Sequence, residues 1–236
     1  MERKENMDAT GAAALVAFAF VLAFNQVVIK LTNNGIQPVF LAGLRSAGAI
    51  AVMIVWMRFR GIKFEIPAGT MVPGLFVGLF FAAEFICLFI ALDMTTVSRA
   101  SVIFYSMPVH LSIAAHFFIP SERLTPLRIL GLGLAMAGVI WVMSDRSNGE
   151  ASLLGDLLAL MAAFGWAAIA LTVKITPLSK VKPELQLFWQ LVVSAPVLLL
   201  LAPLFGDLLR DPQPYHFVGL IFQIFAVASF GFLFWF

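Results

Sequence analysis

The stretch Gly74-Leu-Phe-Val-Gly-Leu-Phe-Phe81 returns in altered form as Gly219-Leu-Ile-Phe-Gln-Ile-Phe-Ala226, 145 residues further along the chain. Pro38 returns as Pro183 at the same spacing. Identity between the two copies is low. What this internal repeat predicts for the fold depends on how many membrane spans separate the copies. An odd number of spans makes the second copy run upside down, and inverted repeats of that kind are typical of secondary transporters.

The composition is that of a membrane protein. Hydrophobic residues make up 61% of the 236 residues and charged residues 12%, whereas about a quarter of a soluble domain is charged. Long uncharged runs approach the roughly 20 residues that a helix needs to cross a bilayer. These runs do not alternate as barrel strands do, and lipid leaves open backbone groups unpaired. The sequence therefore predicts an all-α, polytopic membrane helix bundle.

Eight transmembrane helices are expected. Turn-forming sequences separate them, among them Asn33-Asn34-Gly35 and Asp211-Pro-Gln-Pro214. The first apolar run is too long for the core of a cleaved signal sequence. The eight spans are expected at about 11–31, 39–57, 71–92, 99–119, 127–144, 154–174, 185–206 and 215–236.

The basic residues predict the orientation. With a cytoplasmic N-terminus, ten lysines and arginines fall on inner segments and four on outer ones, which agrees with the positive-inside rule. Five spans then separate each segment from its copy, so the repeat is inverted. No copy of the fourth and fifth spans follows, and we expect a fragment of a ten-helix protein of about 290 residues. The alternative is an eight-helix protein.

Several short motifs carry a family resemblance. They follow one another in order along the whole chain: Asn25-Gln-Val-Val-Ile-Lys30, Leu44-Arg45, Ser98-Arg-Ala-Ser101, Met107-Pro-Val109, Glu122-Arg-Leu-Thr125, Leu130-Gly-Leu-Gly-Leu134 and Phe164-Gly-Trp-Ala167. Together they resemble the EamA family of the drug/metabolite transporter superfamily. Leu22, Met107 and His110 depart from the usual pattern of that family and put any particular substrate in doubt.

The resemblance implies ten helices in two inverted five-helix halves. Residues 1–146 would form the first EamA repeat, and residues 147–236 a truncated second repeat with three helices. The ten helices that the resemblance implies agree with the truncation argued above. The resemblance also implies export of metabolites, amino acids or drugs.

Two charges inside predicted spans are candidates for function. Glu84 would lie roughly 20 Å from the inner surface and Arg45 roughly 9 Å from the outer one, so their depths match. One interpretation is a fixed Arg45–Glu84 ion pair that joins two helices. The other makes Glu84 a site for a substrate amine or a proton, since ionisable groups in a bilayer are costly. Arg45 itself is expected to be structural.

His110 lies near the middle of the fourth span, two residues after Pro108. It could couple transport to protons, because histidine titrates near physiological pH. It could equally be a neutral side chain that satisfies a carbonyl left free by the proline. We expect no metal site, since His116 and His110 have no Glu or Cys at ligand spacing.

Further polar or aromatic side chains are expected along the pathway. Adjacent helical residues point about 100° apart, so Asn25 and Gln26 are not both expected to face the cavity. The family resemblance favours Asn25, because this residue matches the family motif. Ser101 and Tyr105 lie one turn apart on a shared face. Trp166 could stack on an aromatic or cationic substrate. Interhelical packing or hydrogen bonding is the alternative for Asn25 and Trp166. Gly131, Ala135 and Gly138 read as positions of close helix packing.

The expected function is that of a secondary transporter. It would export small organic metabolites, such as amino acids, by alternating access between inverted repeats. The alternative is a flippase or transporter of a lipid-linked or nucleotide-linked substrate. We expect no enzyme activity, cofactor or nucleic-acid partner, and no P-loop for ATP occurs. The lipid bilayer of the inner (plasma) membrane, a small-molecule substrate, proton coupling and a homodimer complete the expected partners.

Overall fold

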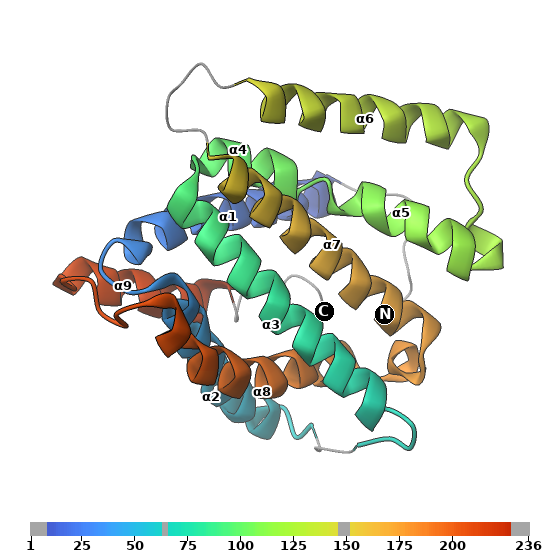
Figure 1. Cartoon of the computed structure of the whole chain (residues 1–236). Coiled ribbons are helices and arrows are strands. Elements are labelled where there is room, and N and C mark those ends of the chain that lie inside the picture. Colours follow the sequence, from blue (N-terminus) through green and yellow to red (C-terminus); the bar gives the residue numbers. More distant parts are fainter. Residues whose placement is uncertain (1–8, 63–65, 146–151, 228–236) are drawn as a thin grey trace.

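The described part of the chain is helical. The structure is a computed structural model and describes residues 9–62, 66–145 and 152–227 (Figure 1). Its α-helices are α1 (Ala9–Asn33), α2 (Pro38–Phe59), α3 (Met71–Met94), α4 (Val97–Phe104), α5 (Met107–Phe118), α6 (Pro126–Ser144), α7 (Leu153–Ile175), α8 (Pro183–Leu201) and α9 (Pro214–Phe222). Short helical turns η1 (Pro120–Glu122), η2 (Pro177–Lys180), η3 (Ala202–Phe205) and η4 (Gln223–Val227) join or extend them.

The all-α prediction is confirmed. Within the described residues, six helices are long and apolar enough to cross a membrane: 38–59, 71–94, 97–118, 126–144, 153–175 and 183–205. The first and last predicted spans correspond to the shorter apolar helices Ala19–Asn33 and Pro214–Phe225. The last predicted span also includes residues 228–236, which lie outside the described residues. The inverted repeat and the full number of spans stay predictions.

Proline and hydroxyl side chains begin several of the helices. Proline occupies the first helical position of α2, α6, α8 and α9, where its missing N–H costs no hydrogen bond. The Thr96 hydroxyl accepts from the Arg99 N–H at 3.3 Å, and the Ser152 hydroxyl accepts from the Gly155 N–H at 3.2 Å. These caps satisfy backbone donors that the first helical turn leaves free.

The fourth span is broken, although the sequence predicted one continuous helix. α4 ends at Phe104, α5 begins at Met107, and Tyr105 and Ser106 form the turn between them. Pro108 follows at the start of α5 and has no N–H to donate to the preceding turn. The break therefore lies at the position where proline removes a helical hydrogen bond.

α3 lies at the centre of the bundle, beside α7 and α8 (Figure 1). Glycines allow this close packing. A Cβ atom added to Gly78 would lie 2.3 Å from Cβ of Val193 on α8, and one added to Gly155 on α7 would lie 3.2 Å from Cβ of Met94. α3 buries residues along its whole length. It packs against α2 of the first expected repeat and against α7 and α8 of the second.

α6 stands apart from the rest of the bundle, along one side of it (Figure 1). Val139 is the buried residue of this helix, and Ala135 is exposed. A Cβ atom added to Gly131 or Gly138 would meet nothing within 4 Å. The prediction that Gly131, Ala135 and Gly138 pack closely against another helix is therefore wrong for the structure described, in which their face of α6 is open.

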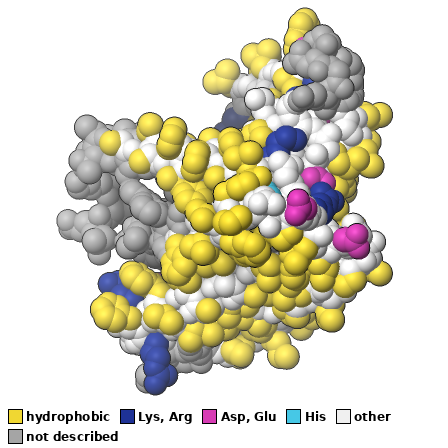
Figure 2. All heavy atoms as spheres, turned by 90° about the vertical axis from the view of Figure 1, so that its left-hand side faces the viewer, with side chains coloured by type: hydrophobic (Ala, Val, Ile, Leu, Met, Phe, Trp, Pro, Cys, Tyr) yellow, Lys and Arg dark blue, Asp and Glu magenta, His cyan; other side chains and the backbone are white. Residues whose placement is uncertain are grey.

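The surface of the molecule is largely apolar. Figure 2 shows hydrophobic side chains over most of one face, with charged side chains confined to a few spots. Phe59 is 85% exposed, and Leu127 and Leu200 are each 79% exposed. In water so much exposed apolar area would be unfavourable, whereas lipid tails are suitable neighbours for it. The surface agrees with a bundle of membrane-spanning helices.

Candidate functional site

Glu84 is a buried carboxyl group where α3 crosses α7. The residue is 3% exposed. A Cβ atom added to Gly165 of α7 would lie 3.2 Å from Cβ of Glu84, so the glycine allows the two helices to meet at this point. The Oε2 atom of Glu84 is buried and has no hydrogen-bond partner among the described residues. A buried carboxylate without a partner is costly, so it marks a candidate functional position.

Arg45 reaches the same region from α2. Its guanidinium carbon lies 4.8 Å from the ring centre of Phe85 and 5.8 Å from that of Phe89. Such contacts stabilise a cation through the negative face of each ring. Phe85 directly follows Glu84 in α3, so the guanidinium lies beside the turn of α3 that carries Glu84. No ion pair joins Arg45 to Glu84 among the described residues, whose ion pairs lie elsewhere.

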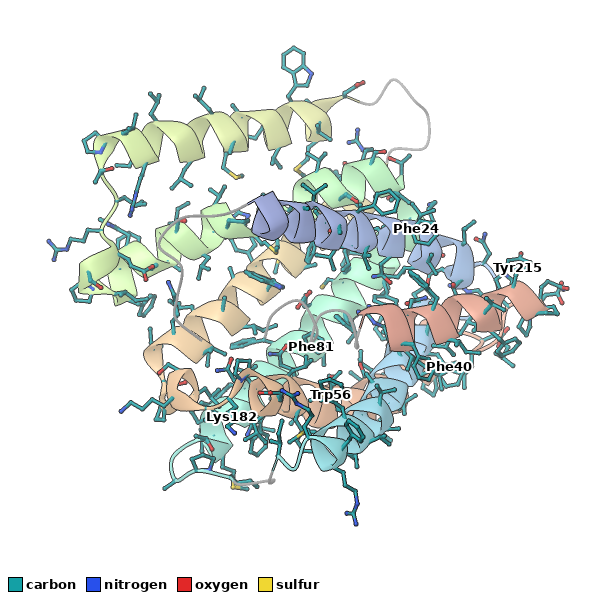
Figure 3. The ribbon with its side chains drawn as sticks, turned by 180° about the vertical axis from the view of Figure 1, so that it is seen from behind. Phe24, Phe40, Trp56, Phe81, Lys182 and Tyr215 are labelled. Carbon is teal, nitrogen blue, oxygen red and sulfur yellow. The ribbon has the colours of Figure 1, made fainter. Side chains whose placement is uncertain are left out.

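Three phenylalanines form an aromatic row along α3. The ring centres of Phe81 and Phe85 are 4.1 Å apart, and those of Phe85 and Phe89 are 5.3 Å apart. Their four-residue spacing places them on one face of the helix, next to Glu84 in sequence. Figure 3 shows Phe81 near the centre of the molecule, where α3 passes α7 and α8. The row gives Arg45 an apolar surface to lie on.

α1 contributes two neighbouring amides to the interior. Asn25 is 5% exposed and Gln26 4% exposed, and neither side-chain oxygen has a hydrogen-bond partner among the described residues. Gln26 lies close enough to the Tyr105 hydroxyl of the α4–α5 turn to interact with it. The sequence favoured Asn25 alone, whereas the structure buries both amides. Ser46 of α2 likewise has a buried hydroxyl without a partner in the part described.

His110 of α5 is hydrogen-bonded to the turn between α4 and α5. Its Nε2 lies 3.1 Å from the Ser106 hydroxyl oxygen, and that hydroxyl donates to the Ile103 carbonyl at 2.6 Å. Because the single hydroxyl hydrogen is already used, Nε2 must be the donor to Ser106. The His110 ring also lies 4.1 Å from the Phe164 ring of α7. The partner of His110 is thus the Ser106 hydroxyl rather than a carbonyl left free by Pro108, and the role of His110 in proton coupling stays a prediction.

The Phe164-Gly165-Trp166 segment of α7 joins several of the candidates. Phe164 contacts His110, Gly165 lies against Glu84, and Trp166 is partly buried against the main core. Ser101 is partly exposed on α4, and Tyr105 is 37% exposed. The helices therefore bring Glu84 and His110 to neighbouring positions on α7. Asn25 and Ser101 share no hydrogen bond with these groups within the described residues.

A polar cluster that the sequence did not predict joins the ends of α4 and α7. The Arg99 Nη2 lies 2.6 Å from the Asp156 Oδ2, and the Asp156 side chain is fully buried. The Thr95 hydroxyl donates to the Asp156 Oδ1 at 3.3 Å. The Lys30 ammonium donates to the carbonyls of Leu92 and Thr95, at 3.0 and 2.8 Å. An aspartate one turn into an apolar helix was the available sequence signal for this cluster.

Other groups lie outside the interior. His116 accepts from the Leu124 N–H at 3.0 Å, near the end of α5. A hollow of about 420 Å³ is bordered by Arg60, Lys180 and Lys182. Figure 3 shows Lys182 at the start of α8, near Trp56 of α2 in that view. In the described ranges no three His, Cys, Asp or Glu side chains are grouped as a metal site would require.

Comparisons with known proteins identify the family of the chain. The EamA-like transporter family matches residues 9–144 and 153–236. An Escherichia coli K12 protein named "Probable amino-acid metabolite efflux pump" is 30% identical over 71% of this chain and 52% of its own length. The "Aromatic amino acid exporter YddG" of Ancylobacter novellus is 27% identical over 58% of this chain and 48% of its own length.

The relatives are longer than this chain, which spans about half the length of those curated proteins. One crystal structure of a protein superposes with a TM-score of 0.65 and 21% identity, and the match covers 95% of this chain and 79% of the other. At that identity the likeness concerns the fold alone. Since the family match extends over both groups of helices, the chain belongs to the EamA-like transporter family of the drug/metabolite transporter superfamily, and it is a multi-pass membrane protein.

Proposed function

We propose that this chain forms part of a secondary transporter that exports small organic metabolites, such as amino acids, across the inner membrane. The observation that carries the proposal is the buried Glu84 at the crossing of α3 and α7, one carboxyl oxygen of which has no hydrogen-bond partner among the described residues. Charges inside a membrane bundle generally face a substrate or ion pathway. Family membership and the printed names of two relatives support an exporter rather than an enzyme.

The pathway would pass between the two inverted repeats and open alternately to each side. Glu84 would bind a substrate ammonium group or a coupled proton. Asn25, Tyr105, Ser101 and His110 would contribute polar groups. Trp166, which is partly buried against the core, would supply an aromatic wall.

Transport by the complete gene product in proteoliposomes tests the proposal. The substrates would be labelled amino acids and nucleosides, with and without an imposed pH gradient, and the proteins would be wild type and Glu84→Gln. We expect saturable flux that the gradient accelerates and that Glu84→Gln loses. Glu122→Gln is the matched control, since it also removes one carboxylate but from an exposed ion pair with Lys174.

The possible results separate the parts of the proposal. Flux that persists in Glu84→Gln would keep the transporter but remove Glu84 from the pathway. Flux that ignores the pH gradient would argue against proton coupling. Absence of flux for every solute would contradict export of small metabolites and shift attention to a lipid-linked or nucleotide-linked substrate.

A further inference from the structure

Arg45 and Glu84 are two opposite charges that share the interior without forming an ion pair. The Glu84 carboxylate has a buried oxygen without a hydrogen-bond partner among the described residues. The Arg45 guanidinium lies on the faces of Phe85 and Phe89, which attract its charge but offer no acceptor in its plane. Arg45 contacts Phe85, the residue that follows Glu84 in α3, yet no ion pair joins Arg45 to Glu84 among the described residues. One oxygen of Glu84 therefore lacks a donor, and the guanidinium lies beside it without an anionic partner within the described part of the chain.

We propose that Arg45 and Glu84 together recognise a zwitterion, with Arg45 binding the α-carboxylate and Glu84 the α-ammonium of an amino acid. The inference rests on the proposed function and adds Arg45, which the sequence suggested was structural, to the substrate site. A guanidinium is suited to a carboxylate because its planar N–H groups can form two parallel hydrogen bonds. A carboxylate in turn accepts hydrogen bonds from an ammonium group.

The local structure holds both groups in fixed positions. Gly165 allows α7 to lie directly against α3 at Glu84. Phe85 and Phe89 position Arg45, because its guanidinium carbon lies 4.8 and 5.8 Å from their ring centres. Two fixed charges of opposite sign select a ligand that carries both charges, since a ligand with only one charge leaves the other group unpaired.

Ligand-induced thermal stabilisation of the complete gene product tests this inference, because it reports binding without requiring transport. Three ligands share one benzyl side chain: L-phenylalanine carries both charges, L-phenylalaninamide lacks the carboxylate, and N-acetyl-L-phenylalanine lacks the ammonium. For the wild-type protein we expect L-phenylalanine to bind roughly tenfold or more tightly than either analogue. The melting temperature without ligand shows whether each variant is folded.

Two single variants should relax opposite requirements. In Arg45→Gln the ratio of the affinity for L-phenylalanine to that for L-phenylalaninamide should fall by roughly tenfold, while N-acetyl-L-phenylalanine still binds weakly. In Glu84→Gln the ratio of the affinity for L-phenylalanine to that for N-acetyl-L-phenylalanine should fall instead. Glu122→Gln, which alters only an exposed ion pair, should leave the wild-type order of the three ligands unchanged. A purely structural role for Arg45 or Glu84 would weaken all three ligands equally.

The remaining outcomes would overturn either the zwitterion site alone or the proposed function as well. Equal weakening of the three ligands in both variants, with L-phenylalanine still bound by the wild type, would overturn the inference and leave the proposed function intact. Transport of other solutes, with no standard zwitterionic amino acid bound, would likewise overturn the inference alone. A wild-type protein that binds no amino acid and transports no solute would overturn both.

Discussion

Gly165 of α7 lies against Glu84 of α3, with only 3.2 Å between the Cβ of Glu84 and the place where a Cβ of residue 165 would be. The same imagined atom would lie 3.4 Å from the Glu84 Cα, so the backbone of α3 is in contact as well. The position of the buried carboxylate therefore depends on an absent side chain on the neighbouring helix. Small residues serve membrane helices in this way because they allow backbones to approach.

Enlarging Gly165 should destabilise the bundle. Gly165→Leu places several carbon atoms where α3 already lies, so we expect a loss of about 1–3 kcal/mol in the free energy of unfolding. Gly131→Leu is the matched control, because a Cβ there meets nothing within 4 Å. Melting of the two purified variants provides the comparison, and equal melting temperatures would show that the α3–α7 crossing is not tightly packed.

Removing the charge of Asp156 should weaken the junction of α4 with α7. In Asp156→Asn the Arg99 guanidinium, whose side chain is only 11% exposed, loses its anionic partner. Removing one partner of a buried ion pair costs about 3–5 kcal/mol, and we expect the lower end of that range here. Glu122→Gln should change stability by less than about 1 kcal/mol, because its side chain and that of Lys174 are 40% and 44% exposed.

Denaturant unfolding monitored by tryptophan fluorescence can separate these two ion pairs. A loss for Asp156→Asn no larger than that for Glu122→Gln would contradict the structural importance of the buried pair. The outcome bears on function too, because Arg99 and Asp156 join the two halves of the chain.

Lys30 should stabilise the end of α3. Its ammonium donates to the carbonyls of Leu92 and Thr95 at the carboxyl end of that helix, where the helix dipole also favours a cation. Lys30→Met keeps the aliphatic length and removes both hydrogen bonds, so we expect a loss of about 1–3 kcal/mol. Lys182→Met, at an exposed position, is the control. Unchanged melting of Lys30→Met would mean that solvent or other groups replace the lysine.

His110 should act through its hydrogen bond rather than through its charge. Gln at this position can still donate to Ser106, so His110→Gln should cost less than about 1.5 kcal/mol. His110→Ala loses that bond and the ring contact with Phe164, and should cost about 2–4 kcal/mol. Proton-driven flux should survive in His110→Gln. A folded His110→Gln protein whose flux no longer responds to a pH gradient would instead support histidine as the coupling group.

The amino-acid sequence predicted the helices with little error, for a reason that each segment carries within itself. An uncharged run such as residues 9–29, and turn residues such as Gly35 and Pro38, determine locally where a helix in lipid begins and ends. The break at Tyr105 and Ser106 was missed, because Pro108 can either kink a membrane helix or be accommodated within it.

Contacts between helices could not be read in this way. The partner of Asp156 is Arg99, 57 residues away, and nothing local to either residue specifies that α4 meets α7. The position of Arg45 on Phe85 and Phe89, rather than in an ion pair with Glu84, depends on how α2 and α3 rotate against one another. The open face of α6, with Gly131 and Gly138 uncovered, likewise depends on which helices pack beside it.

By itself the sequence determined the membrane environment, the helical class, most helix limits and the resemblance to the EamA family, because these depend on composition and on order along the chain. Only the tertiary structure decided that Glu84 lies against Gly165, and that the Arg45 guanidinium lies on Phe85 and Phe89 with no ion pair to Glu84 among the described residues. The physical reason is that the pairing of polar groups in a bundle depends on helix rotation and on close packing, which distant residues determine jointly.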